Sequence, residues 1–106
     1  NSEFLGGYQY SGAGGQVDFV RGAFASRGGK SVMVLHSTAA DERVSRIVPR
    51  VQGPVTTSRM DVHWVVTEHG AVCLKGKSEA ERARDLISIA APQFRDELRY
   101  HATRVR

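Results

Sequence analysis

The residues that most clearly suggest a binding or catalytic role lie in a glycine-rich stretch near the N-terminus. Gly12, Gly14 and Gly15 directly precede an apolar pattern with helical spacing that begins at Gln16. Glycine lets the backbone approach a ligand closely, and the start of a helix offers unpaired N–H groups and about half a positive charge. Together these features suit an anion, a carboxylate or a developing oxyanion. The same residues fit a plain tight turn equally well.

Two nucleotide-binding motifs do not match the chain. A phosphate-binding loop requires Gly-Lys-Ser/Thr, whereas Gly15 is followed by Gln16. Residues 12–17 read GAGGQV, so the last glycine of the dinucleotide fingerprint is missing. The Gly-Lys-Ser sequence at 29–31 lacks the earlier glycine of the loop, and a predicted strand follows it rather than a helix.

A second candidate site follows the most strand-like segment, residues 62–67. Glu68 stands directly after this segment, next to His69 and Gly70. Sites in open α/β sheets form beyond the carboxyl ends of strands, so Glu68 is a candidate acid, base or orienting carboxylate. By itself the residue fits a solvated turn acid better.

The sequence contains no self-sufficient catalytic set. Cys73 is the only cysteine and has no base close to it in sequence, so neither a zinc site nor a reactive thiol is expected. No serine carries an elbow motif. His63 alternates with Trp64 on the predicted strand and is interpreted as structural. The histidines, which lack metal-ligand spacing, are His36, His63, His69 and His101.

Length and composition indicate one small globular domain. The chain has 106 residues, of which 41% are hydrophobic and 25% charged, and no apolar run is long enough to span a membrane. One cysteine allows no internal disulfide, which fits a reducing cytoplasm. The net charge of +4 suits an anionic ligand such as a phosphate ester, or only a solvated surface.

A small set of helices and strands must position the candidate residues. Apolar spacing predicts a helix from Gln16 to about Ser26, ended by a glycine turn at 27–30. The apolar run at 31–35 predicts a strand buried on both faces. Further predicted strands cover 44–51 and 62–67, and a brief apolar stretch follows at 71–74.

Two more helices are predicted in the C-terminal third. Ser78 and Glu81 form a capping-box pattern, and Pro92 suits the first turn of a following helix. The elements together predict an α/β fold, an open sheet with flanking helices. Because so few helices cannot cover both faces of such a sheet, we expect part of the fold to be missing.

Five separated blocks resemble, in order and spacing, the C-terminal part of acetyl-CoA hydrolase/transferase proteins. This group of family I CoA-transferases includes 4-hydroxybutyrate CoA-transferase and succinyl-CoA:acetate CoA-transferase. The resemblance covers nearly the whole chain. The blocks are SGAGGQVDFVRGA (11–23), GGKSVMVLHSTA (28–39), VSRIVPRV (44–51), VTTSRMDVHWVVTEHG (55–70) and LKGKSEAERARDLISIAAPQFRDEL (74–98).

The resemblance implies both a fold and a reaction. The fold is a CoA-transferase-type (NagB/RpiA-like) α/β open sheet with the site between two similar halves. The reaction moves CoA from an acyl-CoA to a short-chain carboxylate through an acyl–glutamyl anhydride and a glutamyl-CoA thioester. Coenzyme A is then a substrate, and no tightly bound cofactor is expected. A cytoplasmic homo-oligomer such as a homodimer is implied, and an acyl-CoA hydrolase of the same family is the alternative.

In this family the nucleophilic glutamate precedes the glycine block. No residue of the chain matches that motif, and the chain begins with Asn1. The resemblance therefore implies that residues 1–106 are a C-terminal domain fragment, inactive without the rest of its own polypeptide. Glu68 is not the nucleophile in this interpretation.

The positions that match the family imply narrower roles. Gly14, Gly15 and Gln16 would lie beside the thioester, where a backbone N–H holds an oxygen. Glu68 would be an auxiliary carboxylate that orients the nucleophile or raises its pKa by like charge. Relatives often carry proline at the position of His36. They also carry a CoA-binding lysine at the position of Ala40, so Arg43 is the nearest candidate for that contact.

A small basic nucleic-acid-binding module is the rival from another class. The positive net charge favours it, but no recognition motif or aromatic RNA-binding pattern accompanies the charge. The arginines that would carry this function are Arg95, Arg99, Arg104 and Arg106.

Overall fold

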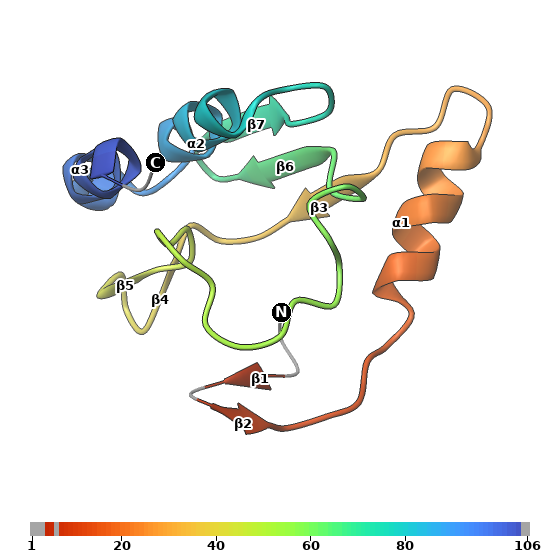
Figure 1. Cartoon of the computed structure of the whole chain (residues 1–106), viewed down its shortest axis with the longest axis horizontal. Helices are drawn as coiled ribbons and strands as arrows, with labels where there is room; N and C mark the ends of the chain where they lie inside the picture. The colour runs from red at the N-terminus through yellow and green to blue at the C-terminus, as the bar shows by residue number, and fades with distance from the viewer. Residues whose placement is uncertain (1–3, 6, 105–106) are drawn as a thin grey trace.

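A three-stranded sheet in the order β3-β6-β7 is the centre of the fold (Figure 1). The computed structural model describes residues 4–5 and 7–104. Within the sheet, β3 (Val32–Val34) runs parallel to β6 (Trp64–Thr67), and β7 (Gly70–Cys73) is antiparallel to β6. The β6–β7 connection is a two-residue hairpin turn, because Thr67 pairs directly with Gly70. The mixed sheet confirms the predicted α/β class.

Three α-helices accompany the sheet in the described part of the chain. They are α1 (Gln16–Ala25), α2 (Glu79–Ser88) and α3 (Arg95–Arg104), the last preceded by a 3-10 turn, η1 (Pro92–Phe94). All begin close to the predicted positions. Two short ribbons complete the fold: β1 (Phe4–Leu5) with β2 (Tyr8–Gln9), and β4 (Thr38–Ala39) with β5 (Val44–Ser45). None of these helices is long and apolar enough to cross a bilayer.

The hydrophobic core lies between one face of the sheet and the C-terminal helices. One cluster joins Val65 of β6 to Leu74 and to Ile89 at the end of α2. A second cluster joins Ile87 and Ala90 to Leu98 of α3. The core is therefore built on one side of the sheet, opposite the face that carries Trp64 and Val66.

The prediction of a strand at 44–51 is mostly wrong, because only Val44–Ser45 forms a strand. Pro49 lacks the N–H that a longer ladder would need. The Ser45 hydroxyl donates to the Ile47 carbonyl at 2.7 Å, a local bond that competes with strand pairing. Val48 and Val51 are exposed rather than buried.

The strand at 31–35 is present as β3, but the prediction that both of its faces are buried is wrong. Val32 is 48% exposed and Val34 is 76% exposed. β3 is the edge strand of the sheet, and in the described residues the core covers only the opposite face. The apolar run thus predicts the strand correctly but does not predict which of its faces are buried.

The capping box of α2 yields a stability prediction. The Ser78 hydroxyl accepts from the Glu81 N–H at 3.2 Å, and the Glu81 carboxylate accepts from the Ser78 N–H at 2.7 Å. Ser78→Ala should lower the free energy of unfolding by about 1 kcal/mol in urea titrations. Ser88→Ala is the matched control, since its hydroxyl bonds to Asp85 in the last turn, and should change it by less than about 0.5 kcal/mol. Equal losses would contradict the cap's role.

Candidate functional site

Glu68 lies in the tight turn between β6 and β7, at the carboxyl ends of the parallel strands β3 and β6. Its Oε1 accepts a hydrogen bond from the backbone N–H of Ser37 at 2.8 Å. Ser37 follows β3 and is 1% exposed, so the bond fixes a buried amide. The Ser37 backbone N–H is the main cause that lowers the pKa of the Glu68 carboxyl below its ordinary value. Glu68 is thus a carboxylate at neutral pH, positioned at the edge where α/β sheets form sites.

The turn that carries Glu68 is itself held in place. Thr67 is 6% exposed, and its hydroxyl donates to the Ile89 carbonyl at 2.6 Å. The same hydroxyl oxygen accepts from the His69 N–H at 3.1 Å. Because Ile89 belongs to the core, these two bonds tie the turn to the rigid part of the domain.

The loop on the other side of the Glu68–Ser37 bond is a strained hairpin. The Ser37 carbonyl accepts from the Arg46 N–H at 2.8 Å, which closes the base of the β4–β5 ribbon. At its tip Ala40, Asp41 and Glu42 all have positive φ, between 53 and 66°, a conformation that costs non-glycine residues roughly 1 kcal/mol each. The Arg43 Nε donates to the Ala40 carbonyl at 2.8 Å, so the exposed guanidinium is held at this tip.

The glycine stretch leads into α1 as predicted. Gly15 is the N-cap residue, and its carbonyl accepts from the Phe19 N–H at 3.0 Å. A Cβ added at Gly15 would lie 3.3 Å from the Phe19 ring, whereas one at Gly14 would meet nothing within 4 Å. Neither residue has a positive φ. What these glycines provide is therefore open access to the backbone, not an unusual conformation.

The Gln16 side chain makes a hydrogen bond that the sequence pattern did not predict. Its Oε1 accepts from the Thr57 hydroxyl at 2.8 Å. Further along the helix, Arg21 makes a bidentate ion pair with Asp61, with N···O distances of 3.2 and 3.1 Å. The Arg21 hydrogen bond lowers the pKa of the Asp61 carboxyl. These contacts fasten α1 to the segment that precedes β6.

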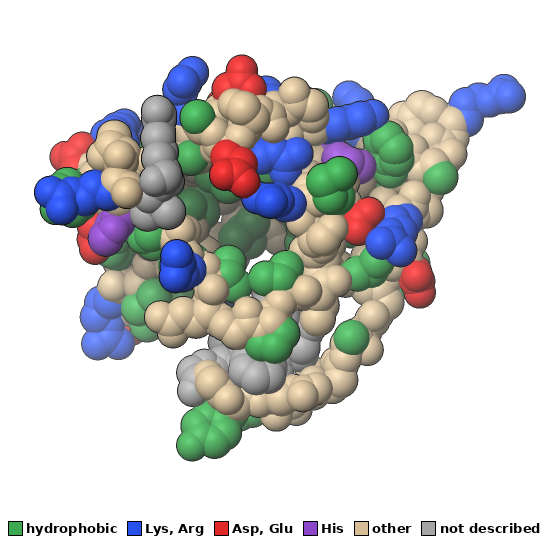
Figure 2. All heavy atoms as spheres, viewed as in Figure 1, with side chains coloured by type: hydrophobic (Ala, Val, Ile, Leu, Met, Phe, Trp, Pro, Cys, Tyr) green, Lys and Arg blue, Asp and Glu red, His purple; other side chains and the backbone are tan. Residues whose placement is uncertain are grey.

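The two candidate sites are not brought together within the described residues. No hydrogen bond or ion pair there joins Gly14, Gly15 or Gln16 to Glu68. In Figure 1 the glycine loop enters α1 at the lower right, while the β6–β7 turn lies at the opposite, left end of the sheet. Figure 2 shows that the face between them is hollowed and that hydrophobic side chains line the hollow.

The remaining sequence candidates have structural surroundings. The His63 ring packs against Phe24 with 4.4 Å between centroids, as expected for a structural residue. Cys73 is a partly buried free thiol. No cluster of metal-ligating side chains occurs in the part of the chain that the structure describes.

The arginines proposed for nucleic-acid binding are largely engaged inside the domain. Arg95 donates to the Ala90 carbonyl, and Arg99 pairs with Asp96. The Arg104 guanidinium lies over the Tyr100 ring at 4.6 Å, while Arg106 lies outside the described residues. Each of these three described guanidinium groups therefore has a partner within the domain. This weakens the hypothesis that α3 binds nucleic acid.

Comparison with known proteins gives one consistent result. A family model described as the acetyl-CoA hydrolase/transferase C-terminal domain matches residues 1–102. A 4-hydroxybutyrate coenzyme A transferase of Clostridium kluyveri is 54% identical over 99 residues, which are 92% of this chain and 23% of that protein. A succinyl-CoA:cyclohexane-1-carboxylate CoA transferase of Geobacter metallireducens is 49% identical over 106 residues, 98% of this chain and 24% of that protein.

Solved structures show the same similarity. RipA from Yersinia pestis is 58% identical with a TM-score of 0.84, over 87% of this chain and 21% of RipA. A 4-hydroxybutyrate CoA-transferase from Porphyromonas gingivalis is 46% identical with a TM-score of 0.78, over 85% of this chain and 22% of that one. The chain thus spans about a quarter of the length of these relatives.

The Glu68–Ser37 bond can be tested with two variants. Glu68→Gln keeps an oxygen acceptor, whereas Glu68→Ala leaves the buried Ser37 N–H without one. We expect faster hydrogen exchange of the Ser37 amide in Glu68→Ala than in Glu68→Gln or the parent. Similar exchange in all three proteins would show that the bond does not hold this loop.

The same bond predicts a pH dependence. Because the folded pKa of Glu68 is lowered, its carboxylate stabilises the fold above the ordinary glutamate pKa of about 4.3, and this contribution is lost as pH falls through the lower folded value. The Ser37 amide NMR shift should titrate below pH 4.3 or so, and should lose this transition in Glu68→Gln. A midpoint at or above the ordinary value would contradict the geometry.

Proposed function

The chain belongs to the acetyl-CoA hydrolase/transferase C-terminal domain family, and we propose that the whole protein transfers CoA from an acyl-CoA to a short-chain carboxylate. The observation that carries this proposal is the high identity to CoA transferases over nearly all of the chain. Since the chain spans about a quarter of those proteins, the activity belongs to a polypeptide that contains more than these residues. Residues 1–106 form the C-terminal domain part of that enzyme.

The proposed mechanism is covalent catalysis by a glutamate outside these 106 residues. A carboxylate oxygen attacks the thioester carbonyl, and the CoA thiolate leaves to give an acyl–glutamyl anhydride. The thiolate then attacks the glutamyl carbonyl, releases the first carboxylate and forms a glutamyl-CoA thioester. The acceptor carboxylate repeats these steps in reverse, which divides one difficult transfer into easier ones.

The glycine stretch contributes backbone donors to this reaction. Gly14 and Gly15 stand at the start of α1, and neither carries a side chain that could cover the backbone N–H groups. Here the Gly15 N–H holds the thioester oxygen as it gains negative charge. The Gln16 side chain, bonded to Thr57, sets the position of this first turn.

Glu68 acts as an auxiliary carboxylate in the proposed site. It remains ionised because the Ser37 N–H favours its charged form. A fixed negative charge close to a second carboxylate raises the pKa of that group and makes it a better nucleophile. Glu68 thereby orients and tunes the nucleophile without forming a covalent bond itself.

Arg43 supplies positive charge for the phosphates of CoA. Ala40 cannot do so, and the Arg43 guanidinium lies beside it at the tip of the β4–β5 ribbon. The neighbouring residues with positive φ fix the direction of this tip. A hydrolase remains the second candidate, because the family description includes both activities. The two activities differ in whether water or a carboxylate attacks the thioester.

A trapping experiment tests the mechanism. The full-length protein is incubated with acyl-CoA, treated with borohydride or hydroxylamine, and mapped by peptide mass spectrometry. We expect a modified glutamate outside residues 1–106. Modification of Glu68 would instead make Glu68 the nucleophile and refute the assignment.

The auxiliary role of Glu68 predicts a kinetic signature. Glu68→Gln in the full-length enzyme should lower kcat by roughly tenfold or more, while KM for acyl-CoA changes little. The reason is that the variant loses charge but keeps the acceptor for Ser37. An unchanged kcat would identify Glu68 as a structural anchor only.

The Arg43 assignment predicts the opposite pattern. Arg43→Ala should raise KM for acyl-CoA roughly fivefold, as for one exposed charge contact of about 1 kcal/mol, with little change in kcat. Arg84→Ala removes an exposed arginine of α2 and is the matched control. Equal effects of the two variants would indicate only a general loss of positive charge.

A further inference from the structure

The free edge of β3 is an open position in the sheet. The Leu35 N–H donates to the Val66 carbonyl at 3.0 Å, and the Trp64 N–H donates to the Ser31 carbonyl at 3.1 Å. Since backbone groups alternate along a strand, the N–H and C=O groups of Val32 and Val34 point away from β6. Within the described residues, β3 pairs with no second strand. Such an edge is a template for another strand.

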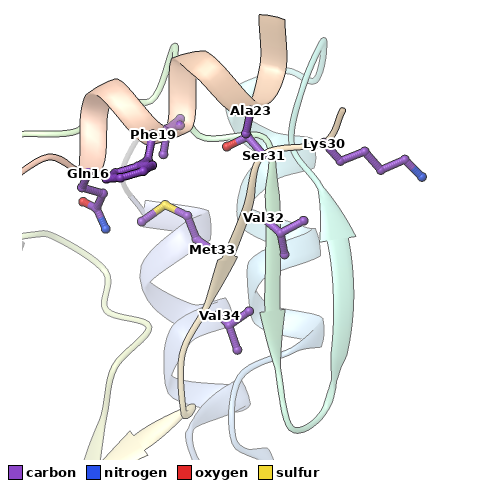
Figure 3. A pocket seen from close by; sticks show the side chains of 9 residues that line it. Gln16, Phe19, Ala23, Lys30, Ser31, Val32, Met33 and Val34 are labelled. Atoms are coloured by element: carbon purple, nitrogen blue, oxygen red, sulfur yellow. The ribbon is translucent and has the colours of Figure 1, made fainter. Parts of the chain in front are cut away.

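A groove runs between this edge and α1. It has a volume of about 450 Å³ and is lined by one face of the helix and by β3. Figure 3 shows Met33 on the side of β3 that approaches Phe19, while Val32 and Val34 point to the other side. The Phe19 side chain is 81% exposed although it belongs to the inward stripe of α1. The helix therefore overhangs space beside β3, where another element would bury this ring.

The apolar residues of the edge lie on the face that the core does not cover. Val32 and Val34 share this face with their register partners Trp64 and Val66. Sheets with parallel strands normally have both faces covered. Figure 2 shows a hollow in the middle of the molecule that is lined by hydrophobic side chains.

We propose that a β-strand from the part of the same protein outside these 106 residues pairs with the free edge of β3, under α1. This inference rests on the proposed function, which makes the chain one part of a longer enzyme. The relatives retain this fold inside chains about four times as long, since the match covers 21 and 22% of the two solved structures. Backbone pairing supplies the affinity, and alternate apolar side chains of the added strand fill the groove.

Thiol labelling of the full-length protein tests whether the edge is covered. Val34→Cys is compared with Met60→Cys, because Val34 is 76% and Met60 is 78% exposed and Met60 lies outside the groove. Each thiol is labelled with iodoacetamide, and its rate is measured at that peptide by mass spectrometry, natively and in urea. We expect native labelling of Val34→Cys to be about tenfold or more slower than in urea. A native rate equal to the rate in urea would overturn the proposal.

Hydrogen exchange of the unmodified full-length protein shows whether the cover is a strand. The Val34 amide should be protected, because it donates to the added strand. Rapid exchange of this amide overturns the proposal even when the thiol is shielded. Loss of this protection when the protein is diluted also overturns the proposal. In that case a second copy of the protein, and not a strand of the same chain, would pair with the edge of β3.

A CoA-transfer assay of the unmodified protein separates this inference from the proposed function. Activity together with an unprotected Val34 amide refutes only the strand pairing. A protected amide in a protein without transferase or hydrolase activity refutes only the proposed function.

Discussion

The parallel pairing of β3 with β6 is the contact on which the rest of the structure depends. It joins segments about thirty positions apart, and it aligns Val32, Met33 and Val34 with Trp64, Val65 and Val66. Because the strands are parallel, their carboxyl ends meet at one edge, which brings the Ser37 amide within 2.8 Å of the Glu68 carboxylate. The same pairing presents Val65 to Leu74 and Ile89, so the core forms on it. A shift in this register would therefore move both the core and the candidate site.

Rigidity is distributed unevenly around this sheet. The Glu68 turn is tied to the core through Thr67 and Ile89. By contrast, α1 is attached through the Gln16–Thr57 bond, the Arg21–Asp61 pair and the packing of Phe24 against His63. Only Val20 of α1 is buried. The turn that carries Glu68 is thus fixed by the core, while the glycine stretch leads into a helix whose apolar face is largely exposed.

This unevenness fits a domain that other parts of a longer protein complete. The exposed Phe19, Val32 and Val34 are costly to leave in water, at about 25 cal/mol per Å² of apolar surface. Phe19, Val32 and Val34 line the groove between α1 and β3, and Figure 2 shows a hollow lined by hydrophobic side chains in the middle of the view. An element that fills this groove would cover the apolar surface.

The sequence alone determined the features that depend on local interactions. Helix starts at Gln16, Ser78 and Pro92 were predictable because capping and helical spacing act within a few residues. The strand that ends before Glu68 was predictable from its β-branched and aromatic residues. The family also followed from the sequence, because five separated blocks agree in order and spacing.

Only the tertiary structure decided which residues meet. The Glu68–Ser37 bond spans 31 positions and the Gln16–Thr57 bond spans 41, and no local pattern encodes either. The apolar run at 31–35 predicted a strand but not an exposed edge, because the run is the same whether neighbouring elements cover it or not. The failure of 44–51 to extend as a strand has a similar cause, since pairing partners and Pro49, not apolar content, set the length of β5. Burial and long-range contacts depend on strand pairing between distant segments, and the three-dimensional arrangement supplies that information.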